Sequence, residues 1–177
     1  AGVLSGTPTS EGSYQFVVRA VNGSPSDTET YTLSVRQPVT VRSPLGAVQR
    51  PSGEVGIRFG RTFTATGGSG TYTWALASGA LPPGVALDST RGAITGTPQT
   101  AGAFAFTLAA TDSEGRVANA SAALTVAPRL AIKTARLQSA KLARSYRMKL
   151  ATAGGVQPLA WKVVRGKLPP GISLSQR

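Results

Sequence analysis

The 177-residue sequence predicts an all-β protein built from tandem β-sandwich repeats. Gly (21 residues) and Pro (12 residues) are abundant, and no long stretch shows the 3.6-residue apolar period of a helix. This combination favours short strands joined by turns. Several segments alternate apolar and polar residues, as strands with one buried face do. Parts of the chain also match one another, and this internal repetition sets the organisation.

Two alignments of the chain with itself define the repeat. Residues 4–20 (LSGTPTSEGSYQFVVRA) match residues 94–110 (ITGTPQTAGAFAFTLAA) at a spacing of 90. Residues 67–87 (GGSGTYTWALASGALPPGVAL) match residues 154–174 (GGVQPLAWKVVRGKLPPGISL) at a spacing of 87. The sequence therefore predicts one complete repeat flanked by parts of two others.

Proline-marked joints at Gln37-Pro38 and Ala127-Pro128 give the expected boundaries. We predict the C-terminal half of a repeat over 1–37, a complete repeat over 38–127 and the N-terminal half of another over 128–177. The two halves together have 87 residues, against 90 in the complete repeat. The last residues, LPPGISLSQR, also continue in register into the first, AGVLSGTP, so the two halves together have the sequence of a whole repeat.

Alternation predicts strands over 13–20, 59–65, 103–110 and 146–152. The inward faces are, in that order, Tyr14, Phe16, Val18 and Ala20; Phe59, Phe63 and Ala65; Phe104, Phe106, Leu108 and Ala110; and Tyr146, Leu150 and Thr152. Arg61 falls on the inward face of its strand, where the partner repeat has Met148. We expect Arg61 to lie near a strand end, with its charge reaching solvent.

The run GGSGTYTWALASGALPPGVALDSTRGAITGTPQTAGAFAFTLAATDSEG at 67–115, its split copies and ALTV at 123–126 resemble bacterial immunoglobulin-like repeats of He-PIG type. Those repeats are related to cadherin-like domains of dystroglycan type. The ordered motifs Gly-Gly, Trp, Leu-Pro-Pro-Gly, Gly-Thr-Pro and Ala-Thr-Asp carry the resemblance, which covers nearly the whole chain. It implies tandem seven-stranded immunoglobulin-like sandwiches of Greek-key type, with Trp74 and its counterpart Trp161 in the core beside the aromatic residues of the strands.

The resemblance also implies a structural or adhesive role in bacterial surface and secreted proteins, with no particular ligand. The chain has no Cys and no His, which excludes disulfides, cysteine nucleophiles, His-dependent triads and Cys/His zinc sites. Asp88 and Asp112 are the pair to consider as general acid and base. Both lie in turn-like contexts, LDSTRG and TDSEG, so we expect no enzymatic activity. The sequence contains no run of 18 apolar residues, so it predicts no transmembrane helix.

Calcium is the cofactor to consider, because cadherin-like relatives often bind it between domains. A Ca²⁺ site takes six to eight oxygen ligands, often from several carboxylates, and this chain has seven acidic residues. Asp112 and Glu114 are the best candidates, with Glu54 as a third ligand from the same repeat. The favoured interpretation is that Asp112 and Glu114 are turn residues before Gly115, and that no metal is bound.

The net charge of +12 is concentrated at one end of the chain. Segment 1–37 carries −1, segment 38–127 carries +2, and segment 128–177 carries +11 with no acidic residue. The candidate residues for binding a polyanion are Arg144, Arg147, Lys149, Lys162, Arg165 and Lys167. Few aromatic residues are interleaved with them, which argues against base-stacking recognition of single-stranded nucleic acid and favours an anionic polysaccharide or another polyanion. The favoured interpretation is a solvated basic face, and charge complementarity with 1–37 is a third possibility.

A half sandwich exposes apolar faces and strand edges, so 128–177 is not expected to be stable alone. One explanation is that the chain is a piece of a longer tandem array. Another is that 128–177 of one copy pairs head-to-tail with 1–37 of the next. Closure within one chain is least favoured, because the two halves should lie at opposite poles. We therefore expect a non-enzymatic structural or adhesive protein, extracellular or on the bacterial surface; the alternative is a polyanion-binding module.

Overall fold

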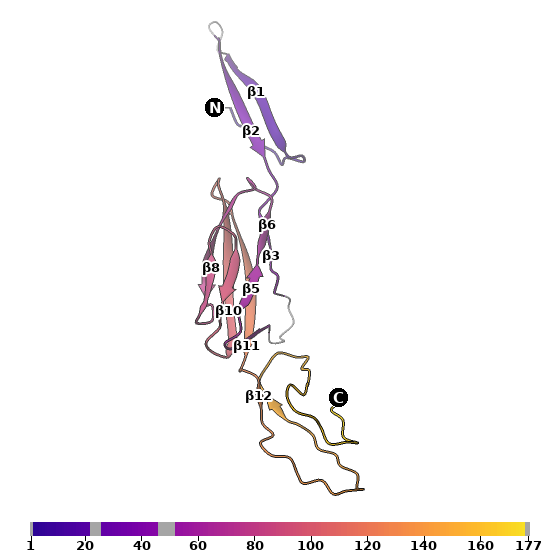
Figure 1. Ribbon diagram of the computed structural model, residues 1–177. Coiled ribbons are helices and arrows are strands. Elements are labelled where there is room, and N and C mark those ends of the chain that lie inside the picture. Colours follow the sequence, from indigo (N-terminus) through magenta and orange to yellow (C-terminus); the bar gives the residue numbers. More distant parts are fainter. Residues whose placement is uncertain (1, 22–25, 46–51, 176–177) are drawn as a thin grey trace.

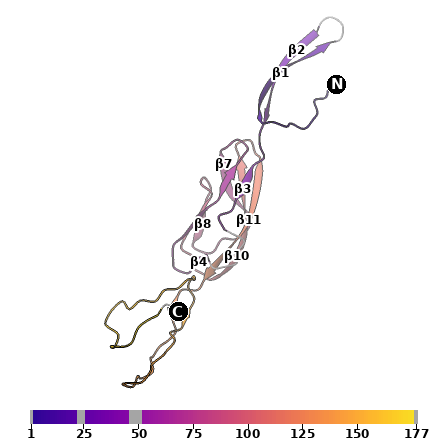
Figure 2. The same ribbon diagram turned by 90° about the vertical axis from the view of Figure 1, so that its right-hand side faces the viewer.

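The computed structural model describes residues 2–21, 26–45 and 52–175. These residues contain strands and turns but no helix, and therefore none that could cross a membrane. The strands are arranged along an elongated molecule (Figure 1). The hairpin of β1 (Gly12–Val21) and β2 (Ser26–Val35) lies at one end, a sandwich formed by the strands β3 to β11 lies in the middle, and residues 128–175 lie at the other end. A view turned by 90° shows the same order (Figure 2).

The central sandwich has two main sheets and a short two-stranded one. One main sheet has the order β4-β11-β10-β7 and the other the order β5-β9-β8, while β3 pairs with β6. The strands are β3 (Thr40–Arg42), β4 (Gly53–Glu54), β5 (Phe59–Thr62), β6 (Thr64–Thr66), β7 (Tyr72–Gly79), β8 (Val85–Asp88), β9 (Ala93–Gly96), β10 (Gly102–Asp112) and β11 (Val117–Ala127). This is the immunoglobulin-like all-β sandwich that the sequence predicts.

Alternation along β10 builds the core. Phe106, Leu108 and Ala110 are buried as predicted, and Phe104 is partly buried against them. Phe63 links the sheets, with its ring centroid 6.4 Å from that of Trp74 and 6.2 Å from that of Phe106. The full set of buried apolar residues is Phe59, Phe63, Trp74, Ile94, Phe106, Leu108, Ala110, Leu124, Val126 and Ala127. Burial of this set is the main stabilising contribution of the central sandwich.

The strand predicted over 59–65 is divided at Phe63. β5 pairs with β9, whereas β6 pairs with β3, so the chain changes its partner strand at this residue. Arg61 lies one residue before the end of β5 and is exposed. Its guanidinium lies 5.4 Å from the centroid of the Phe59 ring and donates a hydrogen bond of 2.8 Å to the carbonyl of Gly60. Arg61 therefore shares a face with Phe59 while its charge stays in solvent, as expected.

The end segments form fewer strands than the centre. β1 (Gly12–Val21) and β2 (Ser26–Val35) form a hairpin, whereas β12 (Ala131–Ile132) and β13 (Thr152–Ala153) pair over two residues each. The strand expected over 146–152 is therefore wrong for most of its length, since it forms only at Thr152. The exposure still alternates, with Tyr146, Met148 and Leu150 half-buried. Among the described residues of this stretch, only Thr152 has a strand partner, Ile132.

Two similar contacts fix the joints between the segments. The N–H of Gly68 donates to the carbonyl of Gln37 at 2.8 Å, and the N–H of Gly155 donates to the carbonyl of Pro128 at 2.8 Å. Both donors belong to Gly-Gly pairs that the internal alignment matches, so the two joints are built alike.

Candidate functional site

The hairpin of β1 and β2 has the same strand register as the hairpin of β10 and β11. Gly12 pairs with Val35 and Tyr14 with Leu33, as Gly102 pairs with Val126 and Phe104 with Leu124. The burial of matched residues differs sharply. Leu124 is 0% exposed, whereas Leu33 is 43% exposed. The apolar face that the central sandwich covers is therefore open in the N-terminal hairpin.

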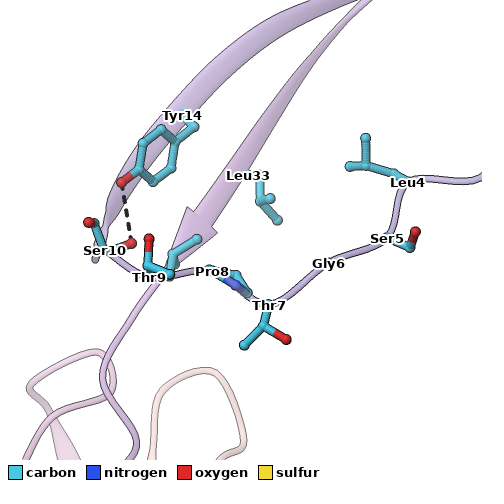
Figure 3. Close-up of a pocket in the computed structure, with 10 residues that line it drawn as sticks. Leu4, Ser5, Gly6, Thr7, Pro8, Thr9, Ser10, Tyr14 and Leu33 are labelled. Atoms are coloured by element: carbon cyan, nitrogen blue, oxygen red, sulfur yellow. Dashed lines mark hydrogen bonds between the residues drawn. The ribbon is translucent and has the colours of Figure 1, made fainter.

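An open pocket of about 630 Å³ lies along this uncovered face (Figure 3). It is lined by residues 4–10, which run past the end of the hairpin, and by Tyr14, Leu33 and Val35 from its strands. The hydroxyl of Tyr14 donates to the carbonyl of Ser10 at 3.2 Å, which holds the two parts together. Apolar and hydroxyl side chains line the pocket, so it suits an apolar strand better than a charged ligand.

Three residues expected in a core are not buried in this chain. Tyr14 is 44% exposed. Phe16 is half-buried, with its ring centroid 6.0 Å from that of Tyr31. Trp161 is also half-buried. Of their counterparts in the central sandwich, by contrast, Trp74 and Phe106 are buried in the core, and Phe104 is half-buried and packs against it.

The six candidate residues for binding a polyanion are all exposed: Arg144, Arg147, Lys149, Lys162, Arg165 and Lys167. Arg147 and Lys149 alternate along the chain with half-buried neighbours. In the described part of the chain, none of the cations in 128–177 has an ion pair, because this segment contains no Asp or Glu. None of these six residues lines the pocket beside the N-terminal hairpin.

The calcium candidates are not brought together. Asp112 and Glu114 lie in the turn between β10 and β11, whereas Glu54 pairs with Ala127 at the far end of β11. The 11 residues of β11 span about 35 Å at the usual rise per residue of a strand. Glu54 accepts a hydrogen bond of 2.8 Å from the N–H of Leu130 at the second joint. Within the described residues, no group of three or more acidic side chains forms, so the three-ligand grouping is wrong.

The side chain of Asp112 is fully buried, and its carboxylate accepts the hydrogen bonds that hold the turn together. Its Oδ1 accepts from the N–H groups of Glu114 and Arg116 at 3.0 and 2.8 Å. Its Oδ2 accepts from the N–H of Ser69 at 3.0 Å and from Nε of Arg116 at 2.9 Å. Burial raises the pKa of Asp112, but these hydrogen bonds outweigh it and lower the pKa to about 2.

Glu114 connects the turn to the first joint. Its Oε1 lies 2.9 Å from Nε of Arg36, and its Oε2 lies 2.7 Å from Nη2 of Arg116. Arg36 directly follows β2, so this exposed ion pair joins the N-terminal hairpin to the central sandwich. The carboxylate oxygens that a metal ion would need are already occupied by N–H donors.

Asp88 likewise serves a local turn. Its Oδ1 accepts from the hydroxyl of Thr90 at 2.7 Å and from the N–H groups of Thr90 and Arg91, each at 3.0 Å. The Thr90 hydroxyl, together with these backbone bonds, lowers the pKa of Asp88. A general acid needs a raised pKa, whereas the pKa values of both Asp88 and Asp112 are lowered.

A family model described as "Putative Ig domain" matches residues 1–36 and 39–127. No curated protein matches the chain. Among solved structures, an intimin fragment in complex with the Tir intimin-binding domain is 16% identical, with a TM-score of 0.44, and the match covers 70% of this chain and 44% of that one. The extracellular domain of protocadherin GammaB4 is 19% identical, with a TM-score of 0.37 and coverages of 80% and 28%.

A protein of Bacteroides fragilis titled a "putative alpha-galactosidase" is 24% identical, with a TM-score of 0.40, and the match covers 50% of this chain and 17% of that one. The chain thus spans less than half the length of each of these three structures. The identities and TM-scores are low, so these likenesses assign neither an activity nor a partner to the chain.

Proposed function

This chain belongs to the putative Ig domain family, and on that basis we propose that it is a non-enzymatic structural or adhesive module of an extracellular or bacterial cell-surface assembly. Segment 128–177 of one copy pairs head-to-tail with segment 1–37 of the next, and the two complete one sandwich between them. Mechanical continuity then comes from sandwiches placed end to end.

The observation that supports this proposal is the contrast between matched hairpins. Leu108 and Leu124 are each 0% exposed in the central sandwich, where two sheets face each other. Val18 and Leu33 occupy the corresponding places in the N-terminal hairpin and are 45% and 43% exposed. An isolated two-stranded hairpin is at best marginally stable in water, so this one needs a covering segment. Segment 128–177 has the sequence of the missing half.

The arrangement of the segments favours pairing between copies over pairing within one. The two incomplete segments lie at opposite ends of the central sandwich in both views (Figures 1 and 2). A contact between different surfaces of successive copies is heterologous, so it does not close and builds an open filament. The net charges are also opposite in sign, with −1 on 1–37 and +11 on 128–177.

Light scattering across a size-exclusion column tests the proposal. The full chain is expected to grow from monomer to open oligomers as its concentration rises. Addition of a free peptide of residues 1–37 should stop this growth, because the peptide caps the open end. A monomer at every concentration would contradict head-to-tail pairing.

A second candidate function is recognition of an anionic polysaccharide by segment 128–177. It is supported by eleven cations in a segment without acidic residues, none of which is ion-paired in the part of the chain that the structure describes. Such a surface attracts a polyanion in a salt-dependent way.

The test is retention on immobilised heparin. Reversal of two charges, with Arg147→Glu and Lys149→Glu, should abolish retention at physiological salt. The matched control, Arg42→Glu with Arg58→Glu, makes the same change of net charge on the central sandwich and should retain most of the binding. Equal losses in both variants would mean that net charge alone causes retention and would end this candidate.

A further inference from the structure

We infer that residues 3–6 of one chain form the middle strand of a three-stranded sheet whose two outer strands, residues 146–149 and 172–175, come from a second copy of the chain. This inference rests on the proposed head-to-tail pairing and specifies its register. It defines an interaction surface, the apolar face and edges of the N-terminal segment, and identifies its partner as the C-terminal segment of another copy.

The template is the sheet of β5, β9 and β8. β9 lies in the middle, where Gly96 pairs with Phe59 of β5 on one side and with Val85 of β8 on the other. Two residues earlier, Ile94 pairs with Arg61 on one side and with Leu87 on the other.

The internal alignments transfer this register to the end segments. The spacing of 90 maps β9 onto residues 3–6, and the spacing of 87 maps β5 and β8 onto residues 146–149 and 172–175. The expected pairs are Gly6 with Tyr146 and Ile172, Ser5 with Arg147 and Ser173, Leu4 with Met148 and Leu174, and Val3 with Lys149 and Ser175. In the structure residues 3–6 form no strand, and Leu4 is 75% exposed.

Glycine geometry gives independent support. Gly96 has a φ of +151°, and a Cβ there would lie 2.0 Å from the carbonyl oxygen of Gly84, so only glycine lets β8 approach β9. Gly6 keeps a φ of +146°, and Gly171, the counterpart of Gly84, keeps a φ of +83° against +84°. Nothing lies within 4 Å of a Cβ built on either one. Both glycines therefore keep the backbone angles that the close contact uses in the central sandwich, with space beside each for another strand.

A second pair of matched glycines, at the edge of the hairpin, also shares a φ value while only one of the two has a close neighbour. Gly79 ends β7 with a φ of +77°, and a Cβ there would lie 2.2 Å from the carbonyl oxygen of Ala105 on β10. Its counterpart Gly166 has a φ of +80° with nothing within 4 Å. Ala105 corresponds to Gln15 of β1. The edge of β1 is therefore the place where the segment ending at Gly166 of the second copy pairs.

Tyr146 of the second copy would fill the pocket beside the hairpin. In the central sandwich the side chains of Phe59, Leu124 and Val126 lie close together. All three are within 3.6–3.7 Å of the position that a Cβ on Gly53 would occupy. Gly6, Leu33 and Val35 line the pocket at the positions of Gly96, Leu124 and Val126. The counterpart of Phe59 is Tyr146, which is only half-buried in its own chain.

Disulfide trapping between two variants tests the register directly, because the natural chain has no Cys. An equimolar mixture of the Ser5→Cys and Ser173→Cys variants should form a covalent dimer on oxidation. Directly paired residues lie within the Cα distance of a disulfide. The matched control replaces the second variant by Ser175→Cys, which lies diagonally across from Ser5 at roughly 7–8 Å and should be trapped far less.

The outcomes separate this inference from the proposed function. A dimer in the first mixture and little in the control supports the register. Light scattering could show oligomers that grow with concentration while both mixtures trap equally or not at all. That result would overturn the register and leave head-to-tail pairing standing. Monomers at every concentration would overturn both.

A glycine variant tests the interface without cysteines. Gly166→Ala should weaken assembly at least tenfold, because the added Cβ clashes with β1 of the neighbouring copy. Gly70→Ala is the control, since Gly70 has a similar φ of +83° and also has nothing within 4 Å. Both variants strain the backbone equally, so an equal effect on assembly would contradict the inference.

Discussion

Asp112 shows how a single carboxylate can be assigned differently once its partners are known. From the sequence, an Asp followed two residues later by a Glu is consistent with either a calcium ligand or a turn. The structure gives the carboxylate four N–H donors and buries it. The sequence predicts the turn, but it could not show that Ser69, 43 residues away, supplies one of those donors.

The first prediction concerns the pH dependence of stability. The pKa of Asp112 is lowered from 3.8 to about 2 in the folded chain, so the unfolded chain binds the proton more readily between these values. The stabilisation from Asp112 is therefore fully present above pH 3.8 and is lost as the pH falls towards 2. Thermal melts between pH 6 and pH 2 should show this loss in the natural chain.

Asp112→Asn should be less stable near neutral pH and should change less with pH over the acid range. The control is Glu29→Gln, on an exposed position of β2, which should keep the pH dependence of the natural chain. If Asp112→Asn retained the full acid dependence, other carboxylates would have to account for it.

The second prediction concerns calcium. Because Arg116 donates to both Asp112 and Glu114, and Arg36 also contacts Glu114, a calcium ion would have to displace these cations. We expect the melting temperature to be the same in millimolar calcium and in a chelator. An increase with calcium that disappears in Glu114→Gln would show that the joint binds the ion.

At the scale of elements, alternation predicts which residues of β10 and β1 share a face, but not whether that face is covered. Coverage depends on strands distant in sequence: the sheet of β5, β9 and β8 lies against that of β10, whereas among the described residues β1 pairs only with β2. The break at Phe63 also escaped sequence reasoning, since the alternating pattern runs through it unchanged. The failure of 146–152 to form a strand has the same cause as the exposure of β1, because a strand needs a partner to satisfy its backbone groups.

The third prediction compares matched positions in two hairpins. Phe106 is 3% exposed, and its counterpart Phe16 is only half-buried. Phe106→Ala should destabilise the central sandwich by about 3–5 kcal/mol in denaturant unfolding. Phe16→Ala should leave that transition unchanged, yet reduce assembly measured by light scattering.

Equal destabilisation of the central sandwich by Phe106→Ala and Phe16→Ala would contradict this prediction. It would mean that the N-terminal hairpin folds as one cooperative unit with the centre, so that its exposed face needs no cover from a second copy.

At the scale of the whole molecule, the internal repetition predicts the order of the segments, and the structure places the two incomplete ones at opposite ends (Figure 1). The sequence could not show that the glycines at these ends keep the backbone angles of their counterparts. Gly6, Gly166 and Gly171 match Gly96, Gly79 and Gly84 within about five degrees. This agreement between matched glycines supports the register inferred above, whereas a positive φ alone does not, since Gly70 has one and also has nothing within 4 Å.

Hydrogen exchange of the unmodified chain at low and high concentration is the most direct measurement of the central claim. In dilute solution the amides of residues 3–6 and 172–175 should exchange quickly, because these residues form no strand. At high concentration both stretches should become protected together, approaching the amides of β8 and β9. Protection of neither stretch, while the oligomers grow, would contradict the claim that two copies share one sandwich.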